Sequence, residues 1–161
     1  MNTIRRAALA IALGASTALL AACSGADDAP TEAGEAAEGL TVSNARVVLA
    51  PVAGNPAAVY FDLSYAGAAP ITLTAVTVEG AGMTMIHDYA ETAGKMQMTM
   101  AGPITLAQGA PVTFAPGGLH VMAMEPADTL AAGGTAKVTL TLSDGTSAVV
   151  DAPVRAAGEE R

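Results

Sequence analysis

The chain lacks tryptophan, has a single cysteine and contains only two phenylalanines and three tyrosines among its 161 residues. With so few aromatic side chains, a core must be built from Val, Leu, Ile, Ala and some Met. The single cysteine, Cys23, excludes an intramolecular disulfide, a thiolate metal site and a cysteine nucleophile in the folded part. Basic residues are also scarce, with seven Lys and Arg against 15 Asp and Glu. This balance argues against nucleic acid as a partner, because phosphate binding needs a basic surface.

The N-terminal 22 residues are typical of a secretory signal peptide. Arg5 and Arg6 form a basic region, and the apolar stretch 7–22 is short for a bilayer span, which needs about 20 residues. A membrane anchor with an incidental cysteine is the alternative. Residues 20–23, Leu-Ala-Ala-Cys, resemble a bacterial lipobox, which implies that Cys23 becomes the first mature residue and carries lipid. Cleavage removes Arg5 and Arg6 and lowers the formal charge from −8 to −10.

The rest of the chain divides into a linker, one domain and a tail. Residues 23–39 hold the lipidated cysteine and an acidic segment without basic or aromatic residues, which reads as a disordered tether. Residues 40–155 form one domain, and residues 156–161 form a polar tail. The sequence therefore predicts an extracytoplasmic domain anchored to a membrane by lipid rather than spanning it.

Alternation of apolar and polar residues predicts β-strands throughout the domain. Residues 59–65 and 138–142 alternate with period two. The apolar parity of residues 71–78 flips at Ala75–Val76, which predicts either a bulge or a strand that crosses between sheets. Asp144-Gly145 signals a two-residue hairpin leading to residues 148–150. With many turns and no amphipathic helix, the pattern predicts an all-β sandwich or barrel.

Three short runs hold both histidines and seven of the eight methionines. Each run places these side chains at positions i, i+2 and i+4, which lie on one face of an extended strand. The runs are Met83-Thr-Met85-Ile-His87, Met96-Gln-Met98-Thr-Met100 and His120-Val-Met122-Ala-Met124.

Alternating methionines on a strand more often fill a core than bind a metal, and we expect some of the seven to do so. Their combination with both histidines nevertheless favours a site for Cu(I), because thioether sulfur is a soft, uncharged ligand. Without cysteine in the domain, the usual structural zinc sites and blue-copper sites are excluded, and no carboxylate cluster suits Ca²⁺ or Mg²⁺. The turn at Pro116-Gly117-Gly118 predicts that His120 lies at the exit of a loop.

The spacing of four of these residues, H-x10-M-x21-H-x-M, is similar to that of the periplasmic copper chaperone family called PCu(A)C. The segment Pro-Gly-Gly-Leu-His-Val-Met-Ala-Met at residues 116–124 also resembles that family. The resemblance implies a cupredoxin-like β-sandwich over about residues 40–155 and one bound Cu(I). It implies copper delivery toward the copper centres of cytochrome c oxidase, with a Sco-type thiol protein as a possible second partner. By position, the implied ligands are His87, Met98, His120 and Met122, and the residues around them or in the core are Met83, Met85, Met96, Met100 and Met124.

No enzyme signature is found: the chain has no Gly-x-Ser-x-Gly elbow and no glycine-rich phosphate loop. We therefore expect a monomeric, lipid-anchored Cu(I) metallochaperone that is not an enzyme. Two alternatives stay open, namely a copper buffer without a dedicated acceptor and a structural β-sandwich lipoprotein whose methionines only fill the core.

Overall fold

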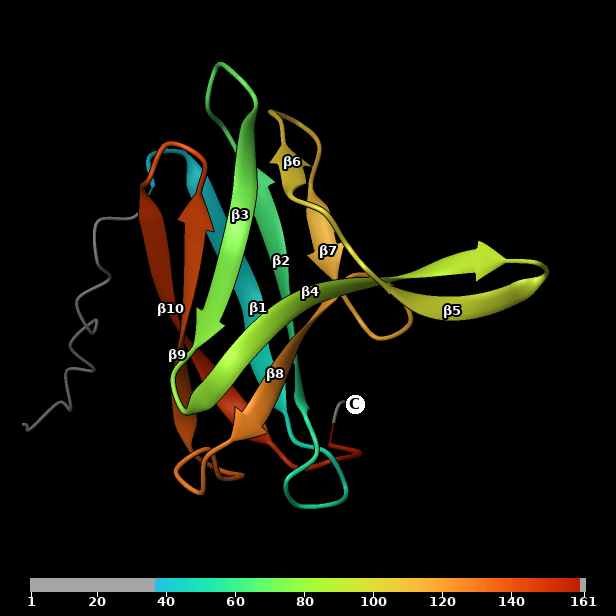
Figure 1. Cartoon of the computed structure of the whole chain (residues 1–161). Helices are drawn as coiled ribbons and strands as arrows, with labels where there is room; N and C mark the ends of the chain where they lie inside the picture. The colour runs from blue at the N-terminus through green and yellow to red at the C-terminus, as the bar shows by residue number, and fades with distance from the viewer. Residues whose placement is uncertain (1–36, 160–161) are drawn as a thin grey trace, which may run out of the picture. The chain divides into compact units, whose positions relative to one another are not determined.

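The computed structural model describes residues 37–159, and the predicted signal peptide, Cys23 and most of the acidic linker lie outside them. The described part of the chain is all β, with ten strands and no helix (Figure 1), so it holds no helix long and apolar enough to cross a membrane. The strands are β1 (Leu40–Val48), β2 (Ala57–Tyr65), β3 (Ile71–Val78), β4 (Ala81–Thr92), β5 (Lys95–Met100), β6 (Ile104–Leu106), β7 (Val112–Phe114), β8 (His120–Pro126), β9 (Thr135–Leu142) and β10 (Ser147–Arg155).

The strands hydrogen-bond in the order β5-β4-β8-β2-β1-β10-β9-β3-β6, with β7 paired to β2. All neighbours are antiparallel except β1 and β10, which pair in parallel at Val47↔Val154. This pairing joins one half of the sheet, β5-β4-β8-β2-β1, to the other half, β10-β9-β3-β6. Core residues come from both halves, for example Val121 from β8 and Leu140 from β9. The predicted all-β fold is confirmed.

Two phenylalanines form the centre of a mainly aliphatic core. Phe61 on β2 pairs with Phe114 on β7, and their rings stack with centroids 4.3 Å apart. Both side chains are almost completely buried. The remaining core residues are mostly Val, Leu and Ala, as the low aromatic content predicts.

The expectation that some methionines fill the core is wrong. None of the seven methionines in the described residues belongs to the buried core or packs against it. Instead, four of them are exposed: Met83, Met96, Met98 and Met100. Their apolar character is therefore not explained by packing inside the domain.

The sequence pattern locates the strands better than it locates their ends. The predicted bulge in β3 is confirmed, because the register with β9 shifts between Leu73 and Ala75. The predicted two-residue hairpin loop is wrong by one residue. Gly145, with a φ of 86°, donates its N–H to the carbonyl of Leu142, and the N–H of Leu142 donates to the carbonyl of Thr146. This pattern is typical of a three-residue loop.

Packing begins before the expected boundary at residue 40. Ala37 is buried in the core, and the carbonyl of Gly39 accepts a hydrogen bond from the N–H of Ala66 at 2.9 Å. The last residues that we assigned to the linker are therefore part of the domain.

The long strand β4 continues with β5 into a hairpin that projects from the rest of the domain (Figure 1). Its turn consists of Ala93 and Gly94, both with positive φ, of 52° and 75°. Two positive φ angles are typical of a type I′ turn, which joins strands in a fixed register. This turn therefore determines which residues of β5 lie opposite those of β4.

We predict that Phe61→Ala lowers the free energy of unfolding by about 3–5 kcal/mol, because it leaves a cavity under Phe114. Chemical denaturation measures the change. Val52→Ala, at an exposed position, serves as the control and should change stability by no more than about 0.5 kcal/mol. Equal losses in the two variants would show that the phenylalanine pair is not the centre of the core.

Candidate metal centre

Strands β4 and β8 pair methionine with methionine and histidine with histidine. The pairs follow one another along the two strands as Met83↔Met124, Met85↔Met122 and His87↔His120. Residues directly opposite one another project from the same face of a sheet, with Cβ atoms about 4.5–5.5 Å apart. The first and third runs of the sequence thus form one continuous ladder of soft side chains.

Strand β5 adds the second run on the other side of β4. Met100 lies opposite His87, and Met98 lies opposite Tyr89. Because the register is set by the β4–β5 turn, Met96, Met98 and Met100 share the face that carries His87. All seven methionines of the domain and both histidines therefore lie on one face of the three strands.

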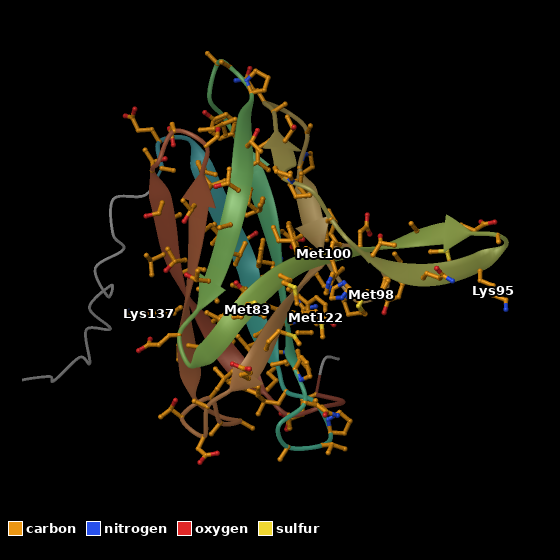
Figure 2. The ribbon with its side chains drawn as sticks, viewed as in Figure 1. Met83, Lys95, Met98, Met100, Met122 and Lys137 are labelled. Carbon is orange, nitrogen blue, oxygen red and sulfur yellow. The ribbon has the colours of Figure 1, made fainter. Side chains whose placement is uncertain are left out.

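This face is the outer face of the sandwich. Val121 and Ala123, which alternate with the site residues on β8, are fully buried. Between Met83 and Met85 on β4, the hydroxyl of Thr84 donates to the carbonyl of Val76 on β3. Figure 2 shows Met98, Met100 and Met122 gathered where the hairpin leaves the body of the domain, with Met83 farther along β4.

The loop before β8 orients His120. Gly118 donates its N–H to the carbonyl of Ala115, and Gly117 has a φ of 82°, as in a type II turn with Pro116 in its second position. The carbonyl of Gly118 then lies 2.8 Å from Nδ1 of His120. Since a carbonyl only accepts hydrogen bonds, we infer that Nδ1 carries the proton. The lone pair of the neutral ring is then on Nε2, where it can bind a metal.

His120 begins β8 directly after a loop, as predicted, and its side chain is buried, with a fractional exposure of 4%. The ring of Tyr89 stacks on it, with centroids 5.6 Å apart and planes inclined by 28°. Sequence reasoning missed Tyr89, although its position two residues after His87 puts it on the same face. The stacked ring and the Gly118 carbonyl hold the imidazole of His120 in one orientation.

His87 lies beside His120, with ring centroids 5.9 Å apart and planes inclined by 54°. Its Nδ1 is buried and has no hydrogen-bond partner among the described residues. A buried nitrogen without a partner is costly unless it meets water or another ligand. Burial, together with the neighbouring His120, lowers the pKa of His87 and favours the neutral form that binds metals.

The four residues implied by the spacing lie on one face, but not all of them are direct cross-strand neighbours of a histidine. His87 and His120 are direct cross-strand neighbours, and Met122 follows His120 on the same face. Met98 is a diagonal neighbour of His87, whereas Met100 lies directly opposite it. Diagonal neighbours are about 7–8 Å apart, within reach of a long side chain such as methionine. Met98 is also less exposed than Met100, at 45% against 72%.

The donor set suits a soft monovalent ion. Among residues 37–159, no group of three His, Cys, Asp or Glu side chains could hold a metal ion. Two neutral imidazoles and several thioethers remain, and such a set favours Cu(I) over hard cations. The residues therefore fit a cuprous ion. The most direct evidence is Nδ1 of His87, which is buried without a hydrogen-bond partner among the described residues.

Comparisons with known proteins find one matching family model and several solved domains of similar fold. The model of the LpqE-like family, whose description is "Putative lipoprotein LpqE-like", matches residues 40–154. No curated protein sequence matches the chain. The copper-bound PCuAC domain from PmoF2 superposes with a TM-score of 0.62 at 21% identity, covering 78% of this chain and 99% of that domain. The apo PCuAC domain from PmoF1 gives 0.61 at 25% identity, with 78% and 99% covered. Cu(I)-bound DR1885 from Deinococcus radiodurans gives 0.61 at 27% identity, with 79% and 85% covered.

We predict that His87 of the copper-free protein titrates below its ordinary pKa of about 6.5, because burial and His120 disfavour its charge. Since the unfolded chain then binds the proton more readily than the folded one, stability falls as the pH drops below about 6.5. NMR titration of the ring protons and denaturation at several pH values measure both effects. His87→Gln should remove its part of the pH dependence, and a pKa of 6.5 or higher would contradict the burial.

Proposed function

The chain belongs to the LpqE-like family, and we propose that it binds one Cu(I) ion through His87, His120, Met98 and Met122. The observation that carries this proposal is the His87↔His120 pair on adjacent strands. The ring of His120 is held by the carbonyl of Gly118, which leaves the lone pair of Nε2 free to bind a metal. The ring of His87 has a buried Nδ1 without a hydrogen-bond partner among the described residues. The relatives of similar fold include copper-bound and Cu(I)-bound forms.

The site suits a carrier rather than a permanent copper centre. Its ligands are neutral, so the bound ion keeps one positive charge. The buried His120 provides a fixed anchor, while Met98 lies on the exposed hairpin strand β5. A thioether on an exposed strand can leave the metal when an acceptor offers a stronger ligand. We therefore propose a metallochaperone, which binds copper and releases it by ligand exchange without catalysing a reaction.

We further propose that the protein works outside the cytoplasm, anchored through lipid on Cys23 and separated from the membrane by the acidic linker. The description of the matched family, "Putative lipoprotein LpqE-like", supports this location. The proposed acceptors are the copper centres of cytochrome c oxidase, with a Sco-type thiol protein as an additional partner.

We predict that the protein loaded with one equivalent of copper shows two nitrogen and two sulfur neighbours by X-ray absorption. His87→Ala should weaken Cu(I) binding by at least about 10-fold, the lower end of what even an outer hydrogen-bond partner costs at a metal site. His87 is the better histidine to replace, because His120 is buried and hydrogen-bonded. Competition with a chromophoric Cu(I) chelator measures the affinity.

Met96→Leu is the matched control for this experiment. Met96 is a methionine of the same face, 62% exposed and paired with Glu91 rather than with a histidine. Its replacement should leave the affinity of the first equivalent unchanged. Equal Cu(I) affinities in the wild type, His87→Ala and Met96→Leu would show that His87 is not a copper ligand.

We also predict that Met98→Leu weakens Cu(I) binding more than Met100→Leu does. Met98 matches the spacing of the family motif and is the less exposed of the two, whereas Met100 extends into solvent. Leucine keeps the apolar volume and removes only the sulfur. The reverse order of affinities would identify Met100, the direct cross-strand partner of His87, as the ligand.

The role in the cell is tested by deleting the gene and measuring growth and respiration. A chaperone predicts loss of cytochrome c oxidase activity at limiting copper, restored by the wild-type chain and not by His87→Ala. Sensitivity to excess copper with normal oxidase activity would instead identify a copper buffer.

A further inference from the structure

Five of the seven methionines of the outer face are not used by the proposed copper site, and three of these lie at the end of the ladder away from the hairpin. They are Met83, Met85 and Met124. Antiparallel sheets usually place polar residues on the face that meets solvent. Met83 is nevertheless 53% exposed, and it is one of only five large hydrophobic side chains that are exposed in the described residues. An exposed apolar side chain at such a position is consistent with a role of its sulfur in binding a ligand.

The register brings these three side chains together. Met83 and Met124 are direct cross-strand partners, and Met85 is the next residue of β4 on the same face. Their neighbours on the other face are held inward, because Ala123 is fully buried and the Thr84 hydroxyl bonds to Val76. Methionine side chains are long and adaptable, so three sulfurs at these positions can meet around one ion.

Met83 and Met124 are separate from the histidine pair, whereas Met85 lies directly opposite Met122, a ligand of the proposed copper site. Met83 and Met124 lie four residues along their strands from His87 and His120, which corresponds to about 13 Å at 3.3 Å per residue. In Figure 2, Met83 lies well away from Met98 and Met100 along β4. An ion held by Met83 and Met124 could therefore not be the ion held by the histidines.

We propose that Met83, Met85 and Met124 form a second site, built only of thioethers, for a soft monovalent cation such as Cu(I) or Ag(I). Thioether sulfur selects such ions over hard cations. The site is weaker than the first because it lacks imidazole. It does not rest on the proposed function, since its three ligands are distinct from those of the histidine site.

The test titrates the purified protein with Ag(I), a redox-stable monovalent ion with a filled d10 configuration like that of Cu(I), and counts bound ions by native mass spectrometry. Two equivalents are expected. The double variant Met83→Leu/Met124→Leu should lose the second equivalent and keep the first. His87→Ala should lose or weaken the first and keep the second, so failure of one site is distinguished from failure of the other.

Carbon-13 labelling of the methionine methyl groups locates the second ion by NMR. The methyl signals of Met83, Met85 and Met124 should shift as the second equivalent is added, in the wild type and in the control variant Met96→Leu. Circular dichroism of the double variant checks that the fold is unchanged, as expected where leucine replaces an exposed and a half-buried methionine outside the core. Binding of one equivalent only, or a second equivalent that persists in the double variant, would overturn the proposal.

Discussion

The register of β4 with its two neighbours is the constraint on which the candidate site depends. Side chains alternate between the faces of a strand, so a slip by one residue would exchange the two faces. Burial of Val121 and Ala123 and the bond from Thr84 to Val76 resist such a slip between β4 and the rest of the sandwich. The Ala93-Gly94 turn sets the register on the other side, and with it the position of β5 relative to His87.

Burial decreases from the histidine pair toward the hairpin, and in the proposed site this gradient divides the roles between histidine and methionine. His120 is fixed on a buried strand by the Gly118 carbonyl and by Tyr89. The methionines of β5 lie on a strand whose residues are all exposed. A rigid scaffold for the strong donors preorganises binding, and exposed soft donors leave room for another protein to take over the ion. The same outer face carries the ladder to its far end at Met83 and Met124.

Local pattern was enough to predict the class of fold, the β3 bulge and the sharing of one face within each methionine run, because alternation depends only on the geometry of an extended chain. It failed at the loop after Leu142, where an added residue changes the turn without changing the signal from Asp144-Gly145. It also failed for the burial of the methionines. Hydropathy shows that methionine can enter a core, but whether it does depends on which face of the strand other elements cover.

The sequence by itself determined the kinds of donor available, namely two imidazoles and seven thioethers without a thiolate in the domain, and the spacing that relates the chain to copper-binding relatives. Only the tertiary structure decided that His87 faces His120, that Met100 rather than Met98 lies directly opposite His87, and that Tyr89 stacks on His120. The reason is physical: chemistry belongs to single residues, whereas the meeting of residues from three strands depends on pairings that no local segment contains.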